Sequence, residues 1–371
     1  MEALNCLFII QGEGRGHMTQ AMAVQTFLED AGHKVGHILM GQSERRDVPS
    51  FFSDHVTAPI TYFGSPNFAV DHQSKSIKAW PTVVYNLRRS PQFMESLAVM
   101  RRVIEDMQPD VIINFFDPLA GLYHLFYRPT APMLCVGHQY MYHHPVYPFP
   151  PGQTVQKLSV KYFTRLSSIG AVKKLGISFY EAPDRPRLAV IPPLLRREIL
   201  DARLTQEPFY LIYLLNKGYG DAVIAWHRRN PEVKLHCFWD NSDVPEEYAY
   251  DQNLTFHQLS GPKFIDMMTR CKGLICTAGF ESVCEAMYLG KPVMVVPVQG
   301  HVEQYWNALD LTTYGGGLSS SEFNIDKLLA MKDKPAHTDS FRSWVLQAEE
   351  RFVYEVEQAA AGWKRPLPVL A

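Results

Sequence analysis

The chain alternates short apolar runs with stretches whose apolar residues recur at helical spacing. Several of the runs are apolar over their whole length rather than at every second position, which is typical of parallel strands buried on both faces. These runs are residues 4–10, 33–40, 111–116, 131–136, 209–215, 233–239, 254–259, 273–276 and 293–297. The rhythm of strand and helix predicts an α/β protein with doubly wound sheets in both halves.

Helices are expected after the first strand and at residues 83–107, 263–270, 324–331 and 340–361, the last as one long amphipathic helix. Ser260 is a plausible N-cap, with Pro262 in the first turn. The polar, irregular residues 63–80 predict a long loop. Residues 139–151 are crowded with Tyr, His and Pro, and we do not expect them to form a helix. They either line an acceptor site or pack against the other domain.

Length and composition indicate the number of domains, the size of the core and the kinds of partner to expect. A length of 371 residues predicts two domains, and 46% hydrophobic with 20% charged residues predicts a full core. We place an N-terminal domain at 1–195, a second domain at 196–340 and a C-terminal helix at 341–371. The formal charge of -2 argues against a nucleic-acid partner.

The expected cellular location is inferred from three features that the sequence lacks: a membrane span, a signal peptide and paired cysteines. No apolar run approaches the ~18 residues of a membrane span, and no basic region precedes an apolar stretch at the start. The six cysteines form no C-x-x-C pair, so buried free thiols are expected rather than zinc ligands. The expectation is a cytoplasmic protein. The basic, partly amphipathic stretch 160–174 allows contact with a membrane surface, although a solvated helix face is the favoured interpretation.

The first candidate site is the glycine-rich turn between the strand at 4–10 and the following helix. Gly12, Gly14 and Gly16 have the spacing G-x-G-x-G, and the second strand ends without an acid, so the dinucleotide fingerprint is not met. The alternatives are a loop that lets a substrate approach the backbone and a purely structural turn. His17 stands at the helix start, where the helix dipole disfavours its cation and makes it a candidate base.

Two further strands deliver polar residues to the same predicted edge of this sheet. Asp117 follows the strand at 111–116, and His138 follows the strand at 131–136. Ligands of open parallel sheets bind outside the carboxyl ends of the strands. His17, Asp117 and His138 are therefore expected along one edge.

The second candidate site is the stretch 277–286, where a strand, a small-residue turn and a helix follow one another. We expect the helix to begin at Gly279, where its free N–H groups and dipole favour an anion such as a diphosphate. Glu285 lies three residues after Ser282, on the same helix face, and can accept from two adjacent hydroxyls. An ordinary turn with a surface Glu is the competing interpretation.

With these residues in view, the chain resembles the GT-B glycosyltransferases, and most of all the peptidoglycan glycosyltransferase that forms lipid II and its UDP-glycosyltransferase relatives. The resemblance rests on Gly279, Ser282, the pair Glu285-Ala286, the Gly-Lys-Pro run at 290–292, Gln304 and the pair Asn307-Ala308, with a weaker match at 14–17. It implies two Rossmann-like domains facing across a cleft, with the C-terminal helix crossing back to the first.

The resemblance also implies donor and acceptor residues. Glu285 would hold the ribose and the turn the diphosphate of a nucleotide sugar, most often a UDP-sugar. The implied donor-binding residues are Gly279, Phe280, Glu281, Ser282, Glu285, Glu303, Gln304, Asn216, Ser260 and Phe264. The implied acceptor-binding residues are Gly14, Arg15, Gly16, His138 and Tyr140.

The implied reaction is inverting hexosyl transfer to an acceptor hydroxyl, without a bound metal or another cofactor. His17 is the first choice for the base, with Asp117 as the second choice or as its orienting partner. The acceptor is unknown; the aromatic and basic stretches allow a lipid-linked one at the inner face of the membrane. A nucleotide-sugar epimerase or hydrolase, or a non-catalytic nucleotide-sugar-binding protein, are the alternatives. Arg15 and Glu281 depart from the family pattern, and an acid beside a diphosphate site has no explanation in the sequence.

Overall fold

The computed structural model describes residues 2–42, 49–66, 90–213, 217–241, 245–331 and 337–362. The chain divides into two compact units. The first unit consists of Met1–Tyr147, Pro151–Leu194 and Leu346–Ala371, and the second of Pro148–Pro150 and Leu195–Val345.

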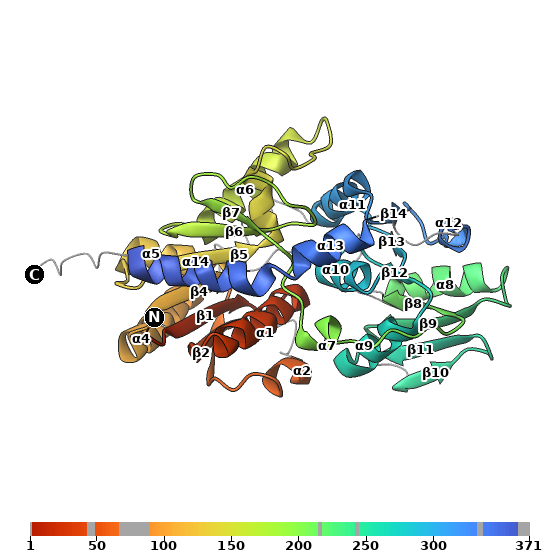
Figure 1. Cartoon of the computed structure of the whole chain (residues 1–371), viewed down its shortest axis with the longest axis horizontal. Helices are drawn as coiled ribbons and strands as arrows, with labels where there is room; N and C mark the ends of the chain where they lie inside the picture. The colour runs from red at the N-terminus through yellow and green to blue at the C-terminus, as the bar shows by residue number, and fades with distance from the viewer. Residues whose placement is uncertain are drawn as a thin grey trace, which may run out of the picture. The chain divides into compact units, whose positions relative to one another are not determined.

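The first unit is built on a parallel sheet with the strand order β3-β2-β1-β4-β5-β6-β7 (Figure 1). Its strands are β1 (Asn5–Gln11), β2 (Lys34–Gln42), β3 (Ile60–Gly64), β4 (Val111–Phe115), β5 (Met133–Gly137), β6 (Lys173–Ile177) and β7 (Leu188–Ile191). Every residue of β4 and β5 is buried, as expected for strands covered on both faces. The order reverses direction between β1 and β4, which makes the carboxyl ends of these strands the natural ligand-binding edge.

Helices cover this sheet and complete its core. They are α1 (Arg15–Asp30), α2 (Ser50–Ser53), α4 (Ser90–Met107), α5 (Pro118–Tyr127), the 3-10 helix η1 (His138–His143), α6 (Thr154–Ser167) and α14 (Ala348–Gly362). The 3-10 turns of η1 lie in the stretch 139–151 that was expected to be non-helical, so that expectation was wrong for its first half. The tight turn follows from Tyr140 and Tyr142, whose fully buried rings tie this segment to the core.

The second unit repeats the plan with the strand order β10-β11-β9-β8-β12-β13-β14. Its strands are β8 (Phe209–Tyr213), β9 (Lys234–Trp239), β10 (Glu247–Ala249), β11 (Leu254–Gln258), β12 (Leu274–Cys276), β13 (Val293–Val295) and β14 (Leu318–Ser319). Only β10, at the edge, runs antiparallel among the described strands. The helices are α7 (Arg197–Leu200), η2 (Lys217–Tyr219), α8 (Gly220–His227), α9 (Gly261–Arg270), α10 (Glu281–Tyr288), α11 (Val302–Tyr314), α12 (Asp326–Leu329) and α13 (Thr338–Val345).

The final helix expected at 340–361 is two helices. Phe341 and Trp344 of α13 are buried in the second unit, where α13 packs against α10. Phe352 and Val356 of α14 are buried in the first unit, where α14 packs against α1 and the sheet (Figure 1). The buried faces of α13 and α14 belong to different hydrophobic cores, and the helix is interrupted between them. Through α14, the C-terminal part of the chain returns to the N-terminal sheet.

For the aromatic stretch 139–151, the sequence left open whether it lines an acceptor site or packs against the other domain. The end of this stretch packs within the second unit. Pro148–Pro150 group with the second unit, where the Phe149 ring lies edge-on to Trp306 with centroids 5.1 Å apart. Trp306 is fully buried.

Candidate functional site

The glycine loop after β1 is held tightly against the end of β2. The Gln11 side-chain oxygen accepts hydrogen bonds from the backbone N–H groups of Glu13 and Gly14, each at 3.1 Å. The Gly12 N–H donates to the carbonyl oxygen of Gly41 at 2.9 Å. A Cβ on Gly12 would lie 2.2 Å from that oxygen, so only glycine fits there.

His17 lies in the first turn of α1, directly above this loop. A Cβ on Gly14 would lie 2.9 Å from Cδ2 of the imidazole, so glycine at this position makes room for the ring. The ring stacks on Phe116 with centroids 5.6 Å apart. Burial lowers the pKa of His17 to about 4, against the opposing effect of a hydrogen bond with Gln20. At neutral pH the imidazole is therefore uncharged.

Phe116 reaches His17 from an unusual backbone conformation. Its φ of 65° is in the left-handed region, which bulky residues rarely adopt. The ring also meets Tyr140 edge-on at 5.5 Å. Strain of this kind persists only where the surroundings enforce it, and it gathers at functional sites. The conformation places one aromatic ring between the core and the candidate base.

Asp117, the next residue, is fully buried and serves as the N-cap of α5. Its Oδ1 accepts from the N–H of Leu119 at 2.8 Å, and its Oδ2 accepts from Ser65 Oγ at 2.6 Å. Burial raises the pKa of Asp117 to about 7, although both hydrogen bonds oppose the shift. Among the described residues no hydrogen bond joins Asp117 to His17, so their pairing stays a prediction.

The other acceptor candidates divide into exposed and buried groups. Gly14, Arg15 and Gly16 are partly exposed at the start of α1. His138 is buried, and its Nδ1 lies 2.8 Å from the carbonyl oxygen of Ile177. Tyr140 is completely buried, and its hydroxyl lies 3.0 Å from Ser167 Oγ. The structure thus gathers the glycine loop, His17 and Asp117 at one edge, while His138 and Tyr140 face the interior.

In the second unit, the turn between β12 and α10 is open at its glycine. The Gly279 N–H donates to the carbonyl of Thr277 at 2.6 Å, and Asn307 Nδ2 donates to the carbonyl of Ala278 at 3.1 Å. Among the described residues, a Cβ on Gly279 would approach only the Thr277 oxygen, at 3.9 Å, and its φ is not positive. Neither packing against those residues nor backbone geometry requires glycine here. The described part of the chain leaves the space beside Gly279 open.

The helix expected at Gly279 begins two residues later, since α10 runs from Glu281 and its N-cap is Phe280. The Phe280 side chain makes no capping hydrogen bond. The first N–H groups of a helix have no partner within it, and the dipole adds partial positive charge. Ser282, in this first turn, is partly exposed. The features that favour an anion are therefore present two residues beyond the predicted start.

Glu285 is buried and forms an ion pair with Arg196, a residue the sequence did not single out. Oε1 of Glu285 accepts from Nη2 of Arg196 at 2.5 Å and from Nε at 3.1 Å. Burial opposes the charge of Arg196, yet Glu285, Glu198 and Glu281 together raise its pKa. The Arg196 guanidinium therefore also lies in the field of Glu281. Glu281 therefore has a cation near it, although no ion pair joins the two side chains among the described contacts.

The remaining donor candidates are spread over several elements. Gln304 is buried and its side-chain oxygen accepts from the Val298 N–H at 2.9 Å, whereas Glu303 is partly exposed in the first turn of α11. Ser260 is the N-cap of α9, as expected, although its side chain makes no capping bond. Phe264 is buried and packs against Tyr213 and Phe238 at 5.0 and 5.3 Å. Asn216 lies outside the described residues.

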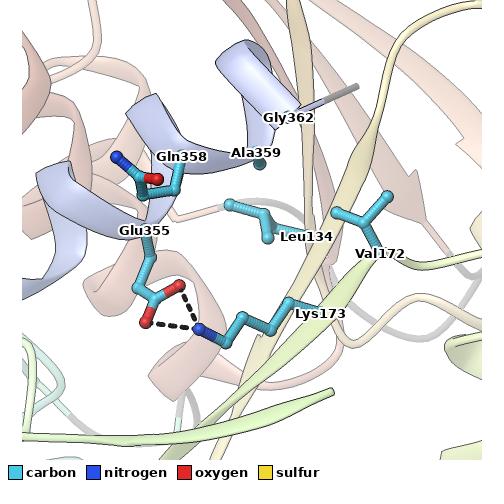
Figure 2. Close-up of a pocket in the computed structure, with 7 residues that line it drawn as sticks. All are labelled: Leu134, Val172, Lys173, Glu355, Gln358, Ala359 and Gly362. Carbon is cyan, nitrogen blue, oxygen red and sulfur yellow. Dashed lines mark hydrogen bonds and ion pairs between the residues drawn. The ribbon is translucent and has the colours of Figure 1, made fainter. Parts of the chain in front are cut away.

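The first unit also contains a groove (Figure 2). It has a volume of about 230 Å³ and is lined by Leu134, Val172, Lys173, Glu355, Gln358, Ala359 and Gly362. Leu134 and Lys173 stand at the amino ends of β5 and β6. His17 and Asp117 stand at the carboxyl ends of their strands, so the groove is not part of the candidate site.

No group of three or more His, Cys, Asp or Glu side chains in the described ranges could hold a metal ion. Among the helices described, none is long and apolar enough to cross a membrane.

The sequence matches the model of glycosyl transferase family 1 over residues 4–332. The chain belongs to this family. It is therefore a glycosyltransferase, as the resemblance of its motifs implied. No curated protein sequence gives a significant match.

Solved glycosyltransferase structures share the fold over nearly the whole chain. MurG of Acinetobacter baumannii has a TM-score of 0.56 at 16% identity, covering 95% of this chain and 99% of its own. The UDP-glucosyltransferase of Polygonum tinctorium has a TM-score of 0.62 at 14% identity, with 98% and 99% covered. VinC, solved in complex with dTDP, has a TM-score of 0.58 at 13% identity, with 97% and 100% covered. The predicted GT-B architecture is confirmed.

Proposed function

We propose that this glycosyltransferase moves a sugar from a nucleotide-sugar donor, a UDP-sugar in our first choice, to an acceptor hydroxyl with inversion at the anomeric carbon. The observation that carries the proposal is the open turn at Gly279, which leads into the uncapped start of α10 and the buried pair Glu285–Arg196. Two of the structural relatives point the same way. One is a UDP-glucosyltransferase and another was solved with dTDP.

In the donor half, the first turn of α10 binds the diphosphate and Glu285 binds the ribose. Both hydrogen bonds from Arg196 end on Oε1 of Glu285. We therefore assign Oε2 to the ribose hydroxyls. Arg196 offsets the cost of burying the carboxylate and fixes its orientation. The N–H groups at the start of α10 would stabilise the charge that grows on the leaving diphosphate.

In the catalytic half, neutral His17 acts as the general base. As the acceptor oxygen bonds to the anomeric carbon, its proton passes to the imidazole and the bond from that carbon to the diphosphate oxygen breaks. The nucleoside diphosphate leaves with the electron pair of that bond. Attack opposite the leaving group inverts the anomeric centre. We propose that the reaction needs no metal, because the helix N-terminus supplies the positive field.

The decisive test is donor binding. Calorimetry with UDP and dTDP should show binding to the wild-type protein, and Glu285→Gln should weaken it about tenfold or more, as expected for a lost hydrogen bond to a hydroxyl. A silent Glu285→Gln variant would remove Glu285 from the donor site. Incubation of the protein with UDP-sugars should yield glycoside of inverted configuration with an acceptor and no free sugar without one. Free sugar released in the absence of acceptor would identify a hydrolase instead.

Cytoplasmic location and a lipid-linked acceptor stay predictions of the same proposal.

EDTA should leave the transfer rate unchanged if no metal takes part.

A further inference from the structure

The loop between β13 and α11 is closed by hydrogen bonds that lead to Gln304. The backbone N–H of His301 donates to the carbonyl oxygen of Val298 at 2.9 Å, across Gly300, whose φ of 77° is in the left-handed region. The Val298 N–H in turn donates to the side-chain oxygen of Gln304 at 2.9 Å. The loop therefore holds the Gln304 amide in one orientation, with its oxygen toward Val298.

His301 holds the backbone of the same residue. It is the N-cap of α11, and its Nδ1 accepts from the Gln304 N–H at 3.4 Å. The residues usually favoured at this position are Ser, Thr, Asp and Asn, so a histidine cap is uncommon. Because a backbone N–H can only donate, Nδ1 is the unprotonated nitrogen and the neutral ring carries its proton on Nε2. Gln304 is thus fixed at its side chain by Val298 and at its backbone by His301.

Gln304 lies on the face of α11 that meets the open turn at Gly279. Asn307, three residues further along the helix and hence on the same face, donates from Nδ2 to the carbonyl oxygen of Ala278 at 3.1 Å. The turn and the loop follow β12 and β13, which are neighbouring parallel strands, so both lie at the carboxyl edge of the sheet. A nucleotide sugar whose diphosphate lies at the start of α10 would therefore bring its sugar close to the start of α11.

We propose that His301 is a positioning residue for sugar transfer and acts through Gln304. This inference rests on the donor site proposed above. With its oxygen held by Val298, the Gln304 amide has its N–H donors to offer, and these meet an oxygen atom of the donor sugar. Without the cap, the first turn of α11 frays and the amide loses its fixed position. His301 thereby sets the affinity for the sugar part of the donor and not for the nucleotide part.

Calorimetry can separate these two parts, because UDP lacks the sugar. The probes are UDP and three UDP-sugars: UDP-glucose, UDP-galactose and UDP-N-acetylglucosamine. His301→Ala should weaken the tightest-binding UDP-sugar about three- to tenfold, as expected for one lost hydrogen bond, and leave the Kd for UDP unchanged. His301→Asn keeps a side-chain acceptor at the cap and should restore most of the affinity. In a Gln304→Leu background, His301→Ala should have no further effect on sugar binding.

Asn324 supplies the matched control for a loss of helix capping alone. Its Oδ1 accepts from the Asp326 N–H at 2.9 Å at the start of α12, a helix that carries none of the candidate donor residues. Asn324→Ala and His301→Ala should both lower Tm by a few degrees. The ratio of the Kd for the UDP-sugar to the Kd for UDP should change in His301→Ala and stay constant in Asn324→Ala.

Two results would overturn the role of His301, and they can be told apart. An unchanged ratio in His301→Ala, with UDP still bound, would reduce His301 to a helix cap and leave the proposed donor site intact. A wild-type protein that binds neither UDP nor the UDP-sugars would remove the donor site itself, and the positioning role with it.

Discussion

A histidine acts as a base only in its neutral form, so the surroundings of His17 decide what it can do. Here burial brings its pKa down to about 4, the Phe116 ring stacks on one face, and Gly14 leaves space at its edge. These contacts fix both the protonation state and the orientation of the ring. Neither Phe116 nor Gly14 needs to touch a substrate to have this effect.

The first prediction concerns His17 itself. His17→Gln should lower the transfer rate by about 10²- to 10⁴-fold, the usual contribution of a general base, while the Kd for UDP measured by calorimetry stays unchanged. The exposed His55 offers a matched control, and His55→Gln should retain full activity. Because the active form is the neutral one and the pKa is lowered, kcat/KM of the wild type should hold as pH falls through 6.5 and decline toward pH 4. A decline centred on pH 6.5 would mean that another group, or an unshifted histidine, is the base.

The second prediction separates orientation from folding by two glycine substitutions in the same loop. A Cβ at Gly14 would meet the movable His17 ring at 2.9 Å, whereas a Cβ at Gly12 would meet the backbone oxygen of Gly41 at 2.2 Å. Gly14→Ala should therefore reduce transfer about tenfold or more by displacing the base, with a small change in Tm. Gly12→Ala should lower Tm by several degrees, as a backbone clash of about 1–3 kcal/mol would. Equal losses of Tm in both variants would contradict this account of Gly14.

At this scale the roles of the candidate site residues stay predictions, and the structure shows what surrounds each of them. Asp117 followed by Pro118 is also the signature of a helix N-cap, and the structure shows that cap. His138 and Tyr140 were expected beside an acceptor, yet they are buried against Ile177 and Ser167. Burial of this kind depends on partners about 30 to 40 residues away, which local spacing does not reveal.

At the scale of elements, Glu285 of α10 forms an ion pair with Arg196, the N-cap residue of the short helix α7. Arg196 is 89 residues from Glu285 in sequence, and the two side chains meet because α7 packs against α10. The sequence indicated only a domain boundary between residues 195 and 196 in this region. The pairing needed the fold, since nothing local specifies which of the arginines turns inward.

The third prediction tests this ion pair. Arg196→Met leaves Glu285 buried without its partner and should cost about 3–5 kcal/mol of unfolding free energy. Glu285→Gln should cost less, because Glu281 and Glu198 still lie near the guanidinium. The double variant should be more stable than the sum of the two losses predicts, as measured by urea denaturation and a double-mutant cycle. Strict additivity would show that the two residues do not interact in solution.

The structure of these elements also explains why residues 340–361 were wrongly predicted to form one helix. The amphipathic pattern at 340–361 is continuous enough to predict one helix, but it serves two cores, one through α13 and one through α14. Periodicity reports that a face is buried and does not report what it is buried against. The doubly wound plan was easier to anticipate, because apolar runs that alternate with helices allow few right-handed arrangements.

For the whole molecule, many histidines are neutral in the folded state and their effects accumulate. Burial is the main cause that lowers the pKa to about 4 at His17, His124, His138, His143, His236 and His257. In the unfolded chain such groups take up protons near pH 6.5. Asp117 works in the opposite direction, since its raised pKa of about 7 lets the folded state hold a proton that the unfolded state releases.

The fourth prediction follows from the balance of these groups. Between pH 6.5 and about 4 the unfolded state binds more protons than the native state, because among the described residues these histidines outnumber Asp117, whose pKa shift acts against them. Stability therefore falls as pH falls through this window, beginning well above the range in which ordinary carboxylates titrate. Urea midpoints measured from pH 8 to pH 4.5 should decline from about pH 6.5 downward. His124→Asn removes one such group and should flatten the decline, although the lost packing lowers the midpoint at every pH. A midpoint that stays constant down to pH 5 would show that these histidines are charged, or free to become charged, in the folded protein.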